Sequence, residues 1–312
     1  MAIKHCTVVI VCGPTASGKS DFAMSLAEKM DGVIINADSA QVYKGLPILT
    51  SAPTTQDQTK IEHLLYNFLE LKEKFCVALY LEKAANTVKE VIARNKTPII
   101  VGGSGLYIST LLRGINHIPQ IDSAILDSLQ EEMLISGTAK VYEKLMNVDA
   151  AFASKINSND SYRILRGYGV FLQSGRTFSS FLTHSRQDPL SAYEKKVILL
   201  HPERHFLYEV CNKRFDSMLG LGAMEEVQAI KNLKDELFLQ NAARVIGFKE
   251  LLLCLNRKMD YQDAVTLAKQ NTRRYAKRQI TWFSNQIAEK QILPYENFAA
   301  LKNIANNFQF LH

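Results

Sequence analysis

The sequence predicts an α/β fold in which a parallel sheet is covered by helices on both faces. Apolar runs at Thr7 to Cys12, Val33 to Ile35 and Thr97 to Val101 are continuous, as in strands that are buried on both faces. They alternate with segments at helical spacing, at 21–30 and 81–94. This alternation of strand and helix is typical of a parallel sheet. A glycine-rich segment directly after the first strand supports the same fold class.

A helical insertion is expected to interrupt the sheet. From about Asn116 to Arg186 the strand pattern is absent, and apolar residues recur at helical spacing instead. Gly137 and Gly175 are expected to end helices there. A further strand at Val197 to Leu200 then resumes the sheet, and helices are expected at 203–219, 225–233 and 264–283. The predicted organisation is therefore a first core segment (1–115), a helical insertion domain (116–190) and a continued core (191–312).

Composition limits the class of protein. The chain has 312 residues, of which 47% are hydrophobic, so it can bury a substantial core without disulfides. Its five cysteines are scattered and form no CxxC pair or zinc motif, as expected for reduced thiols in the cytosol. No apolar run has the length of a signal peptide or a membrane span. We therefore expect a cytoplasmic protein with no membrane partner. The net charge of +6 is compatible with a polyanionic partner.

A complete phosphate-binding motif, GPTASGKS, lies between the first strand and the first helix. Its glycines allow the backbone to wrap around a phosphate, and amides at the start of the helix donate to the phosphate oxygens. Lys19 supplies a positive charge, and the Ser20 hydroxyl is a candidate ligand for Mg²⁺. The motif predicts a P-loop NTPase-like fold. The expected phosphate-binding residues are Gly13, Pro14, Thr15, Ala16, Ser17, Gly18, Lys19 and Ser20.

Two further loops follow strands of the same predicted sheet. The segment NADSAQVYKG places Asp38 after the second strand, and VGGSGLY places Ser104 after the third. Ligands collect at the carboxyl ends of strands in open α/β sheets, so both loops are candidates for the active site. Asp38 can accept a proton or hold Mg²⁺; alternatively, Asp38 and Ser39 only cap a turn. The Ser104 loop can equally be a plain turn.

Together these three segments, in this order and spacing, resemble the motifs of the tRNA dimethylallyltransferases, also called tRNA isopentenyltransferases. Three later segments are similar too: NSNDSYRILRGYGVFLQSG at 157–175, RVIGFKEL at 244–251 and TRRYAKRQITWF at 272–283. The resemblance covers nearly the whole chain. It implies transfer of a dimethylallyl group from dimethylallyl diphosphate to the exocyclic amine of the adenosine 3′-adjacent to the anticodon in tRNA, with release of pyrophosphate. The implied cofactor is Mg²⁺, and the implied macromolecular partner is the tRNA anticodon stem-loop.

The chemistry of this reaction suits the residues. The exocyclic amine of adenine is a poor nucleophile, so a carboxylate that accepts its proton helps, and the resemblance gives Asp38 this role. The leaving pyrophosphate accumulates negative charge, which Lys19, the loop amides and Mg²⁺ can stabilise. By resemblance Arg214 assists them, although the sequence alone equally allows a solvated arginine on a helix. Ser104 stands where the family usually has threonine, and it keeps the hydroxyl that is thought to contact substrate.

RNA contact is expected from a basic stripe, which we define as Lys269, Arg273, Arg274, Lys277 and Arg278 on one predicted helix. Such a run of charge is often only a solvated face, and the aromatic residues within it are often core residues. The resemblance assigns tRNA contact to two further regions, one around Arg163 and Arg166 and one around Arg244 and Lys249. The expected residues are Asp38, Ser39, Ala40, Gln41, Ser104, Tyr162, Arg163, Ile164, Leu165, Arg166, Arg244, Gly247, Lys249, Arg273, Arg274, Lys277 and Arg278.

The chain departs from the family pattern at a few positions. PILTSAP replaces approximately DIGTAKP, with Leu49 for a glycine and Ala52 for a lysine. Gly169 occupies a commonly acidic position, and Cys76 a usual serine. The chain ends at His312 without the zinc finger of many eukaryotic relatives, so a bacterial-type enzyme is expected. We also expect a monomer.

Three other functions stay open at this stage. An adenylate isopentenyltransferase acting on free AMP, ADP or ATP shares the P-loop and the aspartate. The insertion and the basic stripe favour the tRNA enzyme, because a free nucleotide needs neither. A small-molecule P-loop kinase would require ATP as the phosphoryl donor. A non-catalytic RNA-binding protein would leave the phosphate site without a use.

Overall fold

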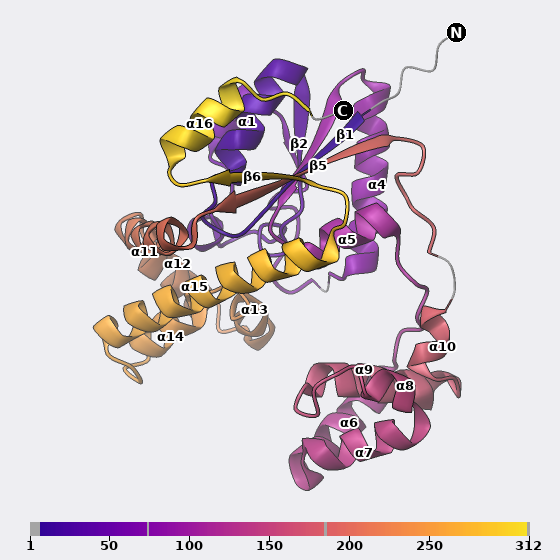
Figure 1. The fold of residues 1–312 in the computed structure, drawn as a ribbon. Helices are drawn as coiled ribbons and strands as arrows, with labels where there is room; N and C mark the ends of the chain where they lie inside the picture. Colours follow the sequence, from indigo (N-terminus) through magenta and orange to yellow (C-terminus); the bar gives the residue numbers. More distant parts are fainter. Residues whose placement is uncertain (1–6, 74, 184–185, 311–312) are drawn as a thin grey trace. The chain divides into compact units, whose positions relative to one another are not determined.

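The computed structural model of the chain describes residues 7–73, 75–183 and 186–310 (Figure 1). It divides into two compact units. The core unit consists of Met1–Arg113 and Asp188–His312, and the insertion unit consists of Gly114–Gln187. The sequence places the insertion at 116–190, so the structure begins and ends it a few residues earlier.

A parallel sheet forms the centre of the core unit. In the described part of the chain it has six strands in the order β3-β2-β4-β1-β5-β6, and every paired neighbour runs parallel. The predicted α/β fold with a parallel sheet is therefore confirmed. The strands are β1 (Thr7–Cys12), β2 (Gly32–Asn36), β3 (His63–Leu64), β4 (Thr97–Gly102), β5 (Glu194–Pro202) and β6 (Gln291–Tyr295).

The sequence patterns did not predict β3 and β6, the two edge strands. β3 is only two residues long, and β6 contains a proline and alternates in burial. Edge strands tolerate proline because one side of the strand needs no ladder hydrogen bond. Neither strand therefore has the continuous apolar run that marks the central strands.

Helices cover both faces of the sheet (Figure 1). The side chains of β1 alternate between two separate cores: Val8 and Ile10 lie in one, Val9 and Val11 in the other. The first core is closed by α4 (Val77–Ala93), α5 (Gly105–Arg113) and the end of α15 (Tyr261–Gln286). The second is closed by α1 (Lys19–Met30) and α16 (Phe298–Asn306).

A third core in the same unit is helical. It contains Phe215, Val227, Phe248 and Val265, together with apolar residues from the loop after β2. α15 packs against α11, α14 and α5. The helices around this core, besides α15, are α2 (Pro47–Thr50), α11 (Arg204–Gly220), α12 (Ala223–Asn232), α13 (Glu236–Ala242) and α14 (Phe248–Leu255), while the short α3 (Thr55–Lys60) buries no residue.

In its described residues the insertion unit contains helices joined by loops, and no strand. Gly137, at φ 83°, ends α6, and Gly175, at φ 67°, ends α9, so both predicted helix ends are confirmed. A small core of its own includes Leu129, Val141 and Leu145. The helices are α6 (Ser123–Ser136), α7 (Thr138–Val148), α8 (Ala150–Ala153), α9 (Ser161–Ser174) and α10 (Phe178–Leu182).

The departures from the family pattern are accommodated locally. Leu49 lies in α2 and is buried in the helical core. A Cβ added at Gly247 would lie 3.2 Å from Leu49 Cδ2. Gly169 is buried on α9, where an added Cβ would lie 2.7 Å from Ile121 Cδ1, so a side chain at this position would require Ile121 to shift. Cys76 is exposed immediately before α4.

The cysteines at 12, 76, 211 and 254 are free; Cys6 lies outside the described residues. Among the helices that the structure describes, none is both long and apolar enough to cross a membrane.

Candidate active site

The P-loop has the backbone geometry that its sequence requires. Gly13 has φ 152°, and an added Cβ there would lie 2.8 Å from the carbonyl oxygen of Leu200. Gly18 adopts the left-handed conformation as the N-cap of α1, so the amides at the start of that helix face the loop. The Ser17 hydroxyl is buried and finds no hydrogen-bond partner among the described residues. A loop with these features suits an anionic ligand that accepts hydrogen bonds.

Lys19 is the first residue of α1, and its ammonium group is held inside the P-loop. Its Nζ donates to the carbonyl oxygen of Pro14 at 2.5 Å. Burial lowers the pKa of Lys19 to about 8; attraction to Asp38 opposes this shift, and repulsion from Arg214 adds to it. An anionic phosphate in the loop would stabilise the charged form of Lys19.

Arg214 joins this site from a distant part of the chain. It lies on α11, and its Nη1 donates to Thr15 Oγ1 in the P-loop at 3.1 Å. Its Nε donates to Ser51 Oγ at 3.0 Å. Burial lowers the pKa of this guanidinium, and Asp38 opposes that shift. Arg214 is therefore directed at the phosphate loop, and the alternative of a solvated helix arginine is wrong.

The loop that carries Asp38 is held in place by Asn36, the last residue of β2. Asn36 Oδ1 accepts from the Asp38 amide at 2.8 Å, and Asn36 Nδ2 donates to the Asp38 carbonyl at 3.0 Å. Asp38 Oδ1 accepts from the amide of Ala40 at 2.9 Å, so the carboxylate does cap a turn. It nevertheless influences the pKa of both Lys19 and Arg214. The sequence reasoning did not single out Asn36, although a buried amide directly after a strand could have indicated it.

The charge of Asp38 acts on four tyrosine side chains. Burial raises the pKa of Tyr66, Tyr80, Tyr107 and Tyr275, and the Asp38 charge contributes to each of these shifts. The rings of Tyr80 and Tyr107 stack with their centroids 3.8 Å apart. The Asp38 charge therefore acts on these tyrosines as well as on Lys19 and Arg214.

The Ser104 loop is joined to the Asp38 loop. Ser104 Oγ accepts from the Ser39 amide at 2.8 Å and donates to Ser39 Oγ at 3.1 Å. The loops approach so closely that a Cβ added at Gly102 would lie 2.1 Å from the carbonyl oxygen of Ala37. The three predicted loops thus form one site at the carboxyl ends of β1, β2 and β4.

The family model described as IPP transferase matches residues 41–286. The chain belongs to the IPP transferase family. It is 42% identical over 294 residues to the tRNA dimethylallyltransferase of Rickettsia conorii, covering 94% of this chain and 81% of that protein. It is 41% identical over 312 residues to the tRNA dimethylallyltransferase of Rickettsia canadensis, covering 99% and 95%.

Solved structures agree. The chain has 30% identity and a TM-score of 0.66 with a tRNA isopentenylpyrophosphate transferase from Staphylococcus epidermidis, covering 97% of this chain and 98% of that one. It has 26% identity and a TM-score of 0.81 with a eukaryotic dimethylallyltransferase acting on tRNA, covering 97% and 79%. The resemblance read from the motifs, the P-loop NTPase-like fold and the expected enzyme class, a prenyltransferase, are confirmed.

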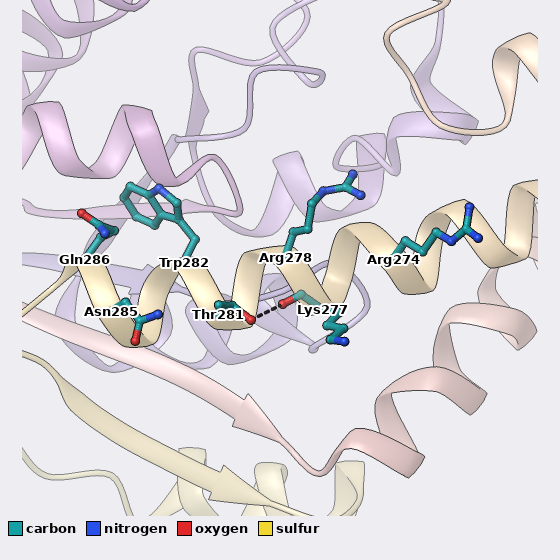
Figure 2. Close-up of a pocket in the computed structure, with 7 residues that line it drawn as sticks. All are labelled: Arg274, Lys277, Arg278, Thr281, Trp282, Asn285 and Gln286. Carbon is teal, nitrogen blue, oxygen red and sulfur yellow. Dashed lines mark hydrogen bonds between the residues drawn. The ribbon is translucent and has the colours of Figure 1, made fainter. Parts of the chain in front are cut away.

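In this IPP transferase the basic stripe is not uniform. Lys269 Nζ pairs with Asp216 at 2.5 Å, and Arg273 Nη1 donates to Asn212 Oδ1 at 2.5 Å, so both point at α11. Arg274, Lys277 and Arg278 are exposed. They line an open pocket of about 510 Å³ on α15 (Figure 2), and its lining residues are Arg274, Lys277, Arg278, Thr281, Trp282, Asn285 and Gln286.

The other residues expected to contact tRNA differ in exposure. On α9, Tyr162 and Arg163 are exposed, whereas Ile164 has no exposed surface and lies in the core of the insertion unit. A contact of the Ile164 side chain with RNA, as the resemblance implied, is therefore wrong for this conformation; Ile164 supports the helix instead. Leu165 and Arg166 are half-buried, and Arg166 Nη2 donates to the Ile118 carbonyl at 3.5 Å.

In the core unit, Arg244 and Lys249 are exposed on either side of Gly247. Gly247 is buried at φ 97°, where a Cβ would lie 2.7 Å from Phe215, so it shapes the start of α14. Gln41 is half-buried, and its Nε2 donates to the carbonyls of Thr50 and Ser51 at 2.9 Å each. It therefore ties the Asp38 loop to Ser51, the residue that also holds Arg214.

Proposed function

We infer that this chain transfers a dimethylallyl group from dimethylallyl diphosphate to the exocyclic amine of the adenosine 3′-adjacent to the anticodon in tRNA, and releases pyrophosphate. The observation that supports this function most strongly is that the P-loop, the Asp38 loop and the Ser104 loop lie together at one edge of the sheet. The P-loop, with Lys19 and Arg214, supplies the site for a leaving diphosphate. Asp38 follows β2 at the same sheet edge, and its charge acts on both cations.

The P-loop side acts on the leaving group. As the allylic carbon–oxygen bond breaks, negative charge grows on the pyrophosphate oxygens. Lys19, Arg214 and the amides at the start of α1 stabilise that charge because their positions are fixed before the reaction. Withdrawal of the electrons into pyrophosphate leaves the allylic carbon open to attack by the amine.

The Asp38 side acts on the nucleophile. The adenine amine forms the new carbon–nitrogen bond, and one of its protons passes to the Asp38 carboxylate. Asn36 holds the backbone of Asp38 and the Ala40 amide donates to its carboxylate, so that the carboxylate does not need to reorganise. Since a base stacked in RNA cannot reach the P-loop ligand, the adenosine must be extruded into the site.

Mg²⁺ fits this site as a partner of the diphosphate. Ser20 is the second residue of α1, next to Lys19, and it is exposed. Mg²⁺ commonly takes few protein ligands and completes its shell with phosphate oxygens and water. Ser20 would be its protein ligand here, and the ion would neutralise charge on the leaving pyrophosphate.

A transfer assay tests the proposal directly. Purified protein is incubated with Mg²⁺, labelled dimethylallyl diphosphate and either unmodified tRNA or AMP. Label is expected in tRNA and not in AMP. The exposed cations on α15 and α9 suit a polyanion such as tRNA, and binding of AMP would not require them. Label in AMP alone would contradict the proposal and favour an adenylate isopentenyltransferase. A cytoplasmic location and a monomeric state stay predictions; gel filtration tests the second.

A further inference from the structure

One buried amide side chain connects the P-loop with the Ser104 loop. Gln279 lies on α15, is 5% exposed, and reaches both loops with its terminal amide group. Its Oε1 accepts from the backbone amide of Thr15 at 2.7 Å. Its Nε2 donates to the carbonyl oxygen of Gly103 at 2.8 Å. Thr15 precedes Gln279 by 264 residues and Gly103 precedes it by 176, so both contacts depend on the tertiary fold.

The Ser104 loop is shaped to receive this helix. A Cβ added at Gly103 would lie 2.4 Å from Gln279 Nε2, and one added at Gly105 would lie 2.3 Å from the Trp282 ring. Neither distance is compatible with an unshifted side chain. The glycines on both sides of Ser104 therefore let α15 approach the loop closely, and they bring the Gln279 amide to the Gly103 carbonyl.

Through these two bonds Gln279 connects the two halves of the site. Thr15 is held twice: its amide donates to Gln279, and its hydroxyl accepts from Arg214 at 3.1 Å. Gly103 is followed by Ser104, which is bonded to Ser39 next to the base. The chain of contacts thus runs from the phosphate loop to the Asp38 loop. Gln279 joins the first two loops of this chain, and Ser104 joins the second to the third.

The chemistry of this position requires glutamine. The bridge needs an acceptor for the Thr15 amide and a donor for the Gly103 carbonyl at the end of one side chain. Glutamate offers two acceptors when ionised, and methionine offers neither group. Either exchange would leave a buried backbone group without a partner, which is costly.

We propose that Gln279 is a positioning residue that keeps the P-loop and the Ser104 loop at a fixed separation, so that pyrophosphate and the base Asp38 are held in register. The proposal rests on the proposed function of this site, and it adds a residue that touches neither substrate. The same helix exposes Arg274, Lys277 and Arg278, so the helix that offers cations to RNA also holds the phosphate loop.

The test uses Gln279→Met, which keeps an unbranched side chain of similar size and removes both hydrogen bonds. Gln262→Met is the matched control, because Gln262 is exposed in the first turn of the same helix. Four quantities are measured for each full-length variant: the Kd of inorganic pyrophosphate by calorimetry, KM and kcat with dimethylallyl diphosphate, retention of tRNA on a filter, and Tm. Kinetics are run well below the lower Tm.

For Gln279→Met we expect the pyrophosphate Kd and the KM for dimethylallyl diphosphate to rise by about tenfold, and kcat to fall, with tRNA retention unchanged. Gln262→Met should match the wild type. A folded Gln279→Met protein with a wild-type pyrophosphate Kd and KM would overturn the proposal, whatever its Tm. If the wild type fails to label tRNA while Gln279→Met still weakens pyrophosphate, the proposed function fails and the positioning role stands.

Gln279→Glu provides a second readout that a purely structural role does not predict. Its ionised carboxylate would face the Gly103 carbonyl, whereas the protonated form can donate to it. The ratio of its KM for dimethylallyl diphosphate to that of the wild type should therefore fall as pH is lowered from 8 to 6. A ratio that stays constant over this range would contradict the bridge. Gln279→Met should show no such change with pH.

Discussion

Arg214 Nη1 donates to Thr15 Oγ1 at 3.1 Å, although the two residues are 199 positions apart in the chain. α11 delivers the guanidinium, and the first turn of the P-loop receives it. A second bond, from Nε to Ser51 Oγ, fixes the plane of the guanidinium. The site therefore holds two cations, Lys19 and Arg214, that come from distant parts of the sequence and contact the same loop.

Arg214→Lys should lower kcat/KM for dimethylallyl diphosphate by about 10²-fold, because lysine keeps the charge but cannot make both directed bonds. Steady-state kinetics at saturating tRNA measure this. Arg204→Lys, on the same helix but exposed, is the control and should be unchanged. Equal activity of wild type and Arg214→Lys would mean that charge alone suffices at this position.

Asp38→Asn should reduce kcat by about 10²- to 10⁴-fold, since the amide cannot accept the proton of the adenine amine. Asparagine retains an oxygen for the Ala40 amide, so the loop should keep its turn. Pyrophosphate binding and tRNA retention should persist. If the variant loses tRNA binding but turns over normally at saturating tRNA, Asp38 is a binding residue and not the base.

Lys19 gives the reaction a predicted dependence on pH. Its pKa in the free enzyme is lowered to about 8, so kcat/KM for dimethylallyl diphosphate should fall as pH rises through about 8 and Lys19 loses its proton. Arg in its place stays charged, so Lys19→Arg should lose this decline even if its activity is lower. A wild-type profile that is flat between pH 7 and 9.5 would contradict the prediction.

The same group affects stability in the opposite direction. Because the folded-state pKa of Lys19 is below its ordinary value of 10.5, the unfolded chain binds more protons between about pH 8 and 10.5. The contribution of Lys19 to the free energy of unfolding should therefore increase as pH rises through that window. Denaturant titrations of wild type and Lys19→Met measure it: their difference should change with pH there and be constant below pH 7.

The exposed and paired cations of α15 should differ in RNA binding. Lys277→Ala should weaken tRNA binding and lower the slope of log K against log salt by about one, because a phosphate contact releases about one counterion. Lys269→Ala is the matched control: its ammonium is paired with Asp216, so the slope should stay at the wild-type value. Identical slopes for wild type and Lys277→Ala would mean that Lys277 contacts no RNA phosphate and that this face is only a solvated surface.

The C-terminal segment should stabilise the P-loop. Tyr295 OH donates to the carbonyl of Ser17 at 2.5 Å, and a Cβ added at Gly18 would lie 2.9 Å from Leu301. Tyr295→Phe should lower the free energy of unfolding by about 1 kcal/mol and weaken pyrophosphate binding. Tyr208→Phe is the control, since its hydroxyl accepts only from exposed Arg204. A Tyr295→Phe protein as stable as the wild type would show that this bond contributes nothing.

Much of this protein could be read from local pattern. Each predicted feature is formed by residues that are contiguous in sequence: the P-loop, the loops at Asp38 and Ser104, the central strands and the helical insertion. Such features can be predicted because backbone conformation and hydrophobic periodicity depend on near neighbours in the chain. The order of those motifs was enough to indicate the family.

Tertiary structure alone decided which distant side chains meet at the site. The sequence equally allowed Arg214 to be solvated, and no sequence pattern marked Gln279 or Tyr295 as site residues. In the basic stripe on α15, Lys269 and Arg273 contact α11, whereas the other cations are exposed. These contacts join positions that are tens to hundreds of residues apart, and a periodic pattern shows that a face is buried without showing what it is buried against. Local sequence therefore specifies which chemical groups are available at the sheet edge, whereas the packing of α11, α15 and the C-terminal strand and helix on the P-loop sets how those groups are positioned.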